Sequence, residues 1–266
     1  ASGLSQKPTL FDAVAELKDA LSKQLGDRRP DLVVAFVSPH YRDAFEDLPE
    51  LVSEALSPAV LIGCSASGVI GGGVEVEQMP AVSLTVAHLP GVAVHAFPLE
   101  LDALPGPDDD PSAWVEAVGV RPRPTPHFVL MTDPYSFDPT GLLMGLDFAY
   151  PGGAKVGGLA SGSVRQGDPS LFLNGETFSS GTVGIALQGN VRVDTIVAQG
   201  CRPVGTPMTV TKCEGALLME LDGRNPFEVL VEIYNALPPG DRRLMQTALL
   251  VGVASTELQE AFGPGD

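Results

Sequence analysis

The sequence predicts an α/β protein of the α+β kind, in which outer helices cover layered sheets of mixed, mostly antiparallel strands. Strand-like apolar runs alternate with segments of helical periodicity along most of the chain. Thirty glycines and 24 prolines among 266 residues interrupt it often, so the elements should be short. With 44% apolar and 18% charged residues, the composition is that of a globular protein. A further observation, an internal repeat, predicts two duplicated halves.

For the first half of the chain, the sequence predicts helices and strands in alternation. Its first helix has apolar residues at helical spacing, with Pro8 before its start and Gly26 at its end. Its first strand, "DLVVAFVS", is almost continuously apolar, as expected of a strand buried on both faces. The predicted elements are a helix over 8–26, a strand over 31–38, a helix over about 49–57, a strand over 59–65 and an antiparallel hairpin over 80–99 that turns at Pro90-Gly91.

The rest of the chain predicts a similar series, and from about residue 201 the start of a third unit. Asp138 or Thr140 can cap the helix near 140, and Asn225 followed by Pro226 marks the start of a helix in the third unit. The predicted elements are a short helix over 112–120, a strand over 127–132, a helix over 140–150, strands near 154–159 and 180–187, a hairpin over 208–223 turning at Glu214-Gly215, a helix from 226, and a strand over 247–255.

Two glycine-rich loops show the repeat most clearly. "LIGCSASGV" and "KVGGLASGS" align at a constant offset of 94 residues, so Gly63 matches Gly157 and Ala66-Ser67-Gly68 matches Ala160-Ser161-Gly162. A strand and a helix precede the loop in both halves. We therefore predict a tandem duplication over about 30–100 and 126–200, with chance similarity among small residues as the alternative. Equivalent loops are expected to flank a common cleft.

The charge balance excludes some partners. The formal net charge is −17, from 33 acidic and 16 basic residues. Such a surface repels phosphate backbones and anionic lipid, which disfavours nucleic-acid binding and membrane attachment. The acidic run at 104–111, "LPGPDDDP", is interpreted as a solvated loop rather than a metal site. No apolar run approaches the length needed to span a bilayer.

Cysteine usage predicts the compartment. Cys64, Cys201 and Cys213 form an odd, sparse set without a CxxC pair, which argues against a disulfide framework or a structural zinc. We expect an intracellular, reducing compartment: the cytoplasm, or an organelle stroma or matrix after removal of a targeting segment. No signal-peptide pattern opens the chain at Ala1.

The glycine loop at 68–73, "GVIGGG", allows three interpretations. No Gly-Lys-Ser/Thr follows it, and it leads into a strand rather than a helix N-terminus, so neither phosphate-binding motif is matched. A tight turn with close backbone packing is one alternative. A small-ligand pocket floored by backbone N–H groups is another.

Few residues in the sequence indicate a catalytic site. Cys64 would need an imidazole to lower its pKa, and its counterpart in the second half is Gly158, so a core cysteine is favoured over a nucleophile. Asp133, after a predicted strand, could cap a helix or meet a ligand amine. Surface cations that could bind a ligand carboxylate are Lys155, Arg165 and Arg202; the alternative is an ordinary surface role. The candidate imidazoles for Cys64 are His40, His88, His95 and His127.

Several motifs in order resemble the FIST family: "IGCSASGVI", "MPAVSLTVAHLPGV", "GGLASGS", "LNGETFSSGTVGIAL" and "CRPVGTPMTVTKCEGALLMELDG". The resemblance implies a helical lead-in over 1–29, a FIST N-like domain over 30–200, and the beginning of a FIST C-like domain over 201–266. Family C-terminal domains normally run past the point where this chain ends. No F-box segment precedes the match, so a role in ubiquitin ligation is not expected.

The resemblance implies a non-enzymatic sensory protein that binds a small, amino-acid-like molecule. Alternatives are an interaction subunit that docks on a larger assembly, and a thiol enzyme dependent on Cys64. We expect no catalytic residue, metal or cofactor, and the possible partners are a small metabolite or another protein. The predicted ligand-binding residues are Cys64, Ser65, Ser67, Gly68, Ala160, Ser161 and Gly162.

Overall fold

The computed structural model describes residues 1–26, 28–106, 109–162, 167–168, 170–196, 203–214 and 217–252. The chain divides into two compact units, Ala1–Thr195 and Ile196–Asp266. The first unit contains both halves of the repeat. None of the described helices is long and apolar enough to cross a membrane.

The first half of unit 1 forms a mixed sheet with helices on one face. Its elements are β1 (Ser2–Ser5), α1 (Leu10–Leu25), β2 (Leu32–Val37), the 3₁₀ helix η1 (Pro39–Asp47), α2 (Leu48–Leu56), β3 (Val60–Ser65), β4 (Gly68–Gly71), β5 (Val74–Glu77) and β6 (Val82–Ala87). The helix predicted over 8–26 is confirmed. Thr9 caps α1 by accepting a hydrogen bond from the Asp12 amide, and Gly26 ends it at φ 64°.

The second half repeats this order. Its elements are β7 (Val92–Leu99), the 3₁₀ helix η2 (Leu101–Ala103), α3 (Pro111–Val118), β8 (His127–Thr132), α4 (Pro139–Ala149), β9 (Lys155–Leu159), β10 (Leu171–Leu173), β11 (Glu176–Phe178) and β12 (Thr182–Gly189). The predicted cap is confirmed for α4, where the Asp138 side chain accepts from the Thr140 amide.

The two larger sheets of unit 1 share the same arrangement of four strands. One runs β1-β6-β2-β3 and continues into β10-β11, and the other runs β7-β12-β8-β9. In both, the helix-connected central pair is parallel, β2 with β3 and β8 with β9, whereas the other pairs are antiparallel. Gly63 pairs with Ala35 and Gly157 with Leu130, so the offset of 94 aligns equivalent positions.

The strand pairing corrects the limits of the repeat. The segments predicted as a hairpin over 80–99 become β6 and β7, which belong to different sheets. Each repeat therefore begins with an edge strand, β1 or β7, that pairs with the last strand of the same repeat, β6 or β12. The short strand β1 was assigned to the helical lead-in, because four residues with two polar side chains carry too little periodicity.

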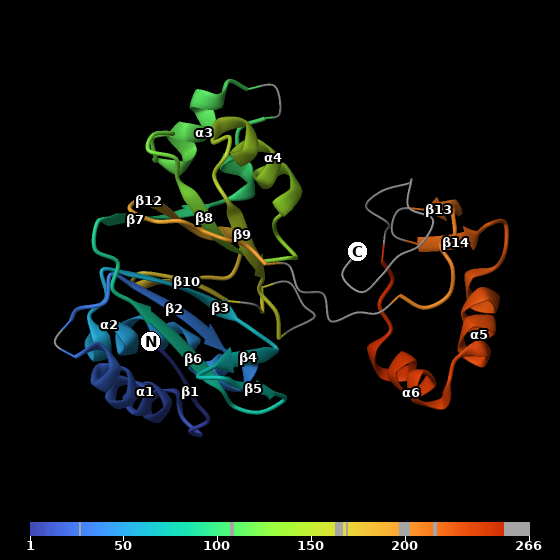
Figure 1. Cartoon of the computed structure of the whole chain (residues 1–266), viewed down its shortest axis with the longest axis horizontal. Coiled ribbons are helices and arrows are strands. Elements are labelled where there is room, and N and C mark those ends of the chain that lie inside the picture. Colours follow the sequence, from blue (N-terminus) through green and yellow to red (C-terminus); the bar gives the residue numbers. More distant parts are fainter. Residues whose placement is uncertain are drawn as a thin grey trace. The chain divides into compact units, whose positions relative to one another are not determined.

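Unit 1 stacks in four layers, as Figure 1 shows: α1 and α2, the first sheet, the second sheet, then α3 and α4. Apolar clusters fill all three interfaces. The middle one brings Ile62 and Cys64 of β3 together with Ile185 of β12. The prediction that helices cover the outside of packed sheets is confirmed.

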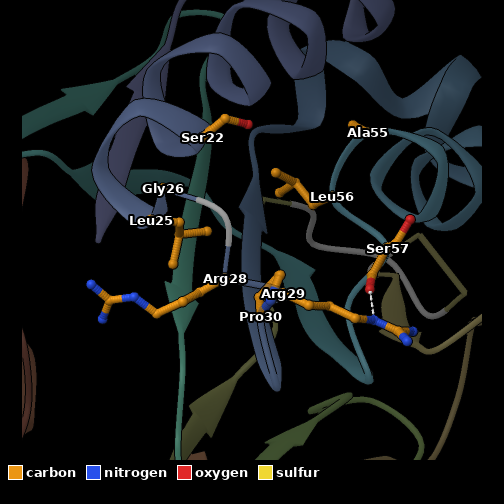
Figure 2. Close-up of a pocket in the computed structure, with 9 residues that line it drawn as sticks. All are labelled: Ser22, Leu25, Gly26, Arg28, Arg29, Pro30, Ala55, Leu56 and Ser57. Atoms are coloured by element: carbon orange, nitrogen blue, oxygen red, sulfur yellow. Dashed lines mark hydrogen bonds between the residues drawn. The ribbon is translucent and has the colours of Figure 1, made fainter.

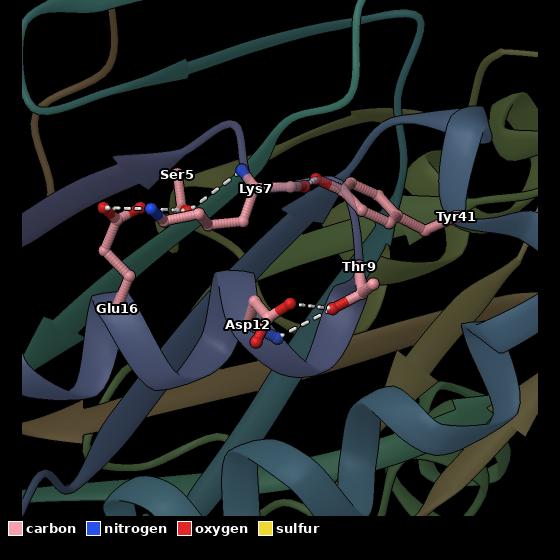
Figure 3. Close-up of polar contacts among 6 residues, drawn as sticks. All are labelled: Ser5, Lys7, Thr9, Asp12, Glu16 and Tyr41. Carbon is pink, nitrogen blue, oxygen red and sulfur yellow. Dashed lines mark hydrogen bonds and ion pairs between the residues drawn. The ribbon is translucent and has the colours of Figure 1, made fainter.

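Polar side chains join the end of β1 to α1 and η1 (Figure 3). The Tyr41 hydroxyl donates to the Lys7 carbonyl at 2.5 Å, and the Ser5 hydroxyl donates to the Glu16 carboxylate at 2.5 Å. Lys7 also lies 3.8 Å from Glu16. These contacts fix the chain between β1 and α1.

Unit 2 contains β13 (Val210–Glu214), β14 (Leu217–Leu221), α5 (Pro226–Ala236) and α6 (Pro239–Ala248). The Asn225 side chain caps α5 by accepting from the Phe227 amide, as predicted. The predicted strand over 247–255 is wrong where it is described, because residues to Ala248 end α6 and 249–252 form no strand. Its remainder lies outside the described residues.

The close approach of β8 and β9 in their parallel pair predicts how stability responds to substitution of the β9 glycines. An added Cβ at Gly157 would lie 1.9 Å from the Leu130 carbonyl oxygen, whereas one at Gly158 would meet nothing within 4 Å. Gly157→Ala should therefore lower the free energy of unfolding by about 2–3 kcal/mol or more, because strand and carbonyl must separate. Gly158→Ala, the matched control, should change it by less than about 0.5 kcal/mol. Urea denaturation measures both, and equal effects would contradict the close approach.

Candidate functional site

The two glycine-rich loops meet at the carboxyl ends of β3 and β9. The Ser161 amide donates to the Ser65 carbonyl at 3.0 Å. The Ser67 amide donates to the Ser161 hydroxyl at 3.0 Å, and these two hydroxyls lie 3.4 Å apart. The predicted convergence of equivalent loops is therefore observed. We call residues 65–68 and 160–162 the loop junction.

Ser65 holds the loop junction together from inside. Its side chain is buried, donates to the Ser161 carbonyl at 3.1 Å and accepts from the Ser170 amide at 3.1 Å. Its amide also donates to the Ser170 carbonyl. These partners occupy the hydroxyl, so Ser65 holds the two loops together, and its role as a ligand contact stays a prediction.

The remaining junction residues differ in exposure. Ser67 is exposed, and Gly68, Ser161 and Gly162 are half-buried. Ala160 is buried, and its amide donates to the Thr132 carbonyl at the end of β8. The polar groups nearest solvent are therefore those of Ser67 and Ser161.

The GVIGGG segment folds as the β4–β5 hairpin. Gly72 and Gly73 have φ of 58° and 82°, which is the turn conformation that glycine favours in two-residue hairpins. A Cβ at Gly71 would lie 2.5 Å from the Ser83 hydroxyl and 2.8 Å from the Gly3 carbonyl. Close packing against β6 and β1 therefore accounts for these glycines, as one of the three interpretations predicted.

Cys64 lies in the apolar layer between the sheets and is 5% exposed. Burial raises the pKa of its thiol to about 12, so the thiol stays protonated near neutral pH. The imidazoles have other contacts: His40 with the Ser38 hydroxyl, His88 with Asp31, His95 stacked on Phe97, and His127 with the Ala154 amide. The placement agrees with the interpretation of Cys64 as a core residue, and its role as a ligand contact stays a prediction.

Asp133 is the unusual residue of this region. It follows β8 directly, is fully buried, and its amide donates to the Gly181 carbonyl. One carboxylate oxygen accepts from the Tyr135 amide at 3.4 Å, but Oδ2 has no hydrogen-bond partner among the described residues. Of the two roles predicted for Asp133, capping is observed at the turn through the Tyr135 amide, whereas α4 itself is capped by Asp138.

The equivalent position in the first repeat is occupied by a smaller, satisfied side chain. The register that pairs Val37 with Ser65 and Thr132 with Leu159 makes Ser38 the counterpart of Asp133. The Ser38 hydroxyl accepts from the Ala81 amide at 2.9 Å. A buried carboxylate with an unpaired oxygen is costly, so its presence only in the second repeat indicates a role beyond folding.

The other polar candidates contribute less. Lys155 is buried, donates to the Tyr150 carbonyl at 2.8 Å and pairs with Asp147 at 2.7 Å, so it is committed to the fold. Arg165, Arg202 and Cys201 lie outside the described residues. Among the described side chains, no group of three His, Cys, Asp or Glu gathers to hold a metal ion.

Two surface cavities lie away from the loop junction. One, of about 280 Å³, sits at the ends of α1 and α2 beside Arg28 and Arg29. In Figure 2 these two side chains point in opposite directions, and Arg29 donates to the Ser57 carbonyl at 2.6 Å. They therefore do not converge on a common anion. The second, of about 440 Å³, lies between the start of α1 and α2. The common cleft predicted between the two loops coincides with neither cavity.

Comparisons with known proteins identify the family. The chain matches the FIST N domain over residues 31–224. It is 35% identical to an uncharacterized protein of Mycobacterium tuberculosis over 99% of this chain and 67% of that protein. It is also 33% identical to an uncharacterized protein of Mycobacterium bovis, over 99% of this chain and 66% of that protein. The chain belongs to the FIST family, whose domains are generally sensory, ligand-binding domains of signalling proteins.

The family match also bears on domain organisation. It includes the β13–β14 hairpin and ends at residue 224, beyond the limit near residue 200 predicted for the FIST N-like domain. An incomplete C-terminal FIST domain from residue 201 stays a prediction.

The burial of Cys64 predicts a difference in thiol reactivity. Iodoacetamide at pH 7.5 should label Cys213, which is exposed, and leave Cys64 unmodified. The reason is that alkylation requires a thiolate, and burial raises the pKa of Cys64 to about 12. Peptide mapping by mass spectrometry quantifies each cysteine, and unfolding in urea should make both react. Rapid labelling of Cys64 in the folded protein would contradict this placement.

The loop junction predicts unequal costs for two similar substitutions. Ser65→Ala should lower the free energy of unfolding by about 2 kcal/mol, because it removes two buried hydrogen bonds. Ser67→Ala should cost less than about 0.5 kcal/mol, since water can replace the exposed hydroxyl. Chemical denaturation monitored by circular dichroism provides the comparison. A neutral Ser65→Ala would show that the hydroxyl does not hold the loops together.

Proposed function

We propose that this chain is a non-enzymatic sensory protein that binds a small metabolite carrying a protonated amine at the loop junction. Membership of the FIST family supports the general role. The amine, and the amino-acid-like class of ligand that the sequence resemblance implied, are proposed from the residues around Asp133.

The unpaired Asp133 carboxylate oxygen is the observation that carries this proposal. It provides a negative charge and a free acceptor, which an ammonium group satisfies with a charge-assisted hydrogen bond. Asp133 is also next to the loop junction, because the Ala160 amide bonds to the carbonyl of Thr132, its immediate neighbour.

The loop junction supplies groups for the other end of such a ligand. The Ser67 and Ser161 hydroxyls lie nearest solvent, and the side chains of Glu77 and Pro39 pack beside Gly68 and Gly162. Hydroxyl and amide donors can bind a carboxylate. Acceptor and donors on neighbouring loops suit an α-amino acid better than a purely anionic metabolite. Because Asp133 is fully buried without ligand, binding requires the loops to move apart.

The proposal is of binding rather than catalysis for chemical reasons. The Cys64 thiol is protonated at neutral pH and has no hydrogen bond to a histidine. The Ser65 hydroxyl is occupied by Ser161 and Ser170 instead of a general base. A thiol enzyme dependent on Cys64 would require a different environment.

A thermal-shift screen against amino acids and other amines, preceded by native mass spectrometry, tests the proposal. A ligand at about a hundredfold its dissociation constant should stabilise the fold by about 2.7 kcal/mol and raise the melting temperature by a few degrees. Asp133→Asn should weaken binding about 10- to 100-fold, because the ammonium loses its charged partner. Ser161→Leu should also abolish the shift by filling the loop junction.

Asp138→Asn is the matched control. Asp138 is an exposed aspartate on the following turn, and asparagine caps a helix as well as aspartate does. This variant should bind like the original chain. Absence of any bound mass or thermal shift, or equal binding by Asp133→Asn, would reject the proposed site.

A further inference from the structure

Among the described strands, none pairs with the outer edge of β9 in the second sheet. β9 is the last strand of the order β7-β12-β8-β9, and β8 is its partner among the described strands. In a parallel pair, alternate residues bond to the neighbouring strand. The Ala160 amide donates to the Thr132 carbonyl, and the Ala154 carbonyl accepts from the Phe128 amide, so both residues bond to β8 or its ends. Because the bonding residues alternate, the N–H and C=O groups of Gly157 and Leu159 point away from β8.

The equivalent edge of the first repeat is covered. There β3 accepts the antiparallel strand β10, which pairs Phe172 with Gly63. The Ser65 amide, at the position equivalent to Leu159, donates to the Ser170 carbonyl at 2.8 Å. The same backbone arrangement therefore already binds an antiparallel strand once in this molecule.

The β9 edge lacks the features that normally keep an edge strand from pairing. It contains no proline, and its central residues Gly157 and Gly158 have no side chains to obstruct a neighbour. Its lysine, Lys155, is buried and paired with Asp147, so it does not guard the edge. Val156 and Leu159 are 39% and 53% exposed.

Helix α4 lies beside the strand on the face of the sheet that carries Leu159. Lys155 and Leu159 share a face of the sheet, and the Lys155–Asp147 pair shows that α4 covers that face. The exposed apolar residues of α4 are Leu143, Met144 and Phe148, which are 39%, 68% and 58% exposed. Large apolar side chains gathered on one surface are typical of an interaction site.

The charge of the chain and the shape of this surface indicate which partner fits the β9 edge and α4. Copies of a chain with net charge −17 repel one another over most surfaces. α4 and β9 together carry Asp147 and Lys155 as their only charged residues, and these form an ion pair. An isolated peptide on the β9 edge would leave α4 uncovered, whereas a second copy brings both a strand and an apolar helix.

We propose that two copies of this chain dimerise through β9. The two β9 strands pair antiparallel about a twofold axis perpendicular to the sheet, and the four strands of each copy form one continuous sheet. The axis places the two α4 helices side by side on the same face. The interface is self-complementary, as twofold symmetry requires.

Sedimentation velocity of the whole chain tests the dimer. The original protein should sediment as a dimer, and Val156→Lys combined with Leu159→Lys should be monomeric. Its dimer dissociation constant should rise at least about a hundredfold, because two apolar side chains per copy lose their burial and like charges face each other. Ile70→Lys combined with Val74→Lys is the matched control, since both residues are more than half exposed on the β4–β5 hairpin. The control should remain dimeric.

Hydrogen exchange resolves the remaining outcomes. In the dimer the Gly157 and Leu159 amides should exchange slowly, and in the Val156/Leu159 variant rapidly. Both variants should keep the circular dichroism spectrum of the original protein, which shows that the fold is intact. A monomer up to about 100 μM, well above micromolar affinity, would overturn the proposal. Protected Gly157 and Leu159 amides in a monomer would assign the edge to this chain itself. A dimer that persists in the Val156/Leu159 variant would place the interface elsewhere.

Discussion

The apolar layer between the two sheets is the contact on which the rest of unit 1 depends. Each sheet is covered by helices on its outer face, so the inner faces can be removed from water only by packing on each other. Burying one large aliphatic side chain contributes about 1.5–3 kcal/mol, and this layer contains several from both repeats. Because the layer excludes water, Cys64 within it is a protonated thiol.

This packing also brings the two repeats to the loop junction. The first sheet includes β10 and β11 from the second repeat, so the repeats share strands as well as an interface. Ser65 connects them directly, through the Ser161 carbonyl and the Ser170 amide. The proposed ligand site therefore forms where both repeats contribute backbone, and neither repeat alone would build it.

The two repeats have diverged where function is proposed. Among the described residues, β3 is covered by β10 whereas no strand covers the outer edge of β9, and the Ser38 hydroxyl is hydrogen-bonded whereas Asp133 keeps an unpaired oxygen. Each position in the second repeat can therefore be compared with the equivalent position in the first. In this comparison, both the buried carboxylate and the apolar strand edge occur only in the second repeat.

The sequence by itself determined the elements that local chemistry controls. Helical spacing and caps predicted α1, α4 and α5, and the offset of 94 predicted the equivalence of Gly63 and Gly157. Tertiary structure alone decided that β6 and β7 part into different sheets, that Ser65 is occupied, and that Asp133 is buried without a full set of partners. Strand pairing and burial depend on contacts between residues that are distant in the chain, and no local sequence pattern specifies those contacts.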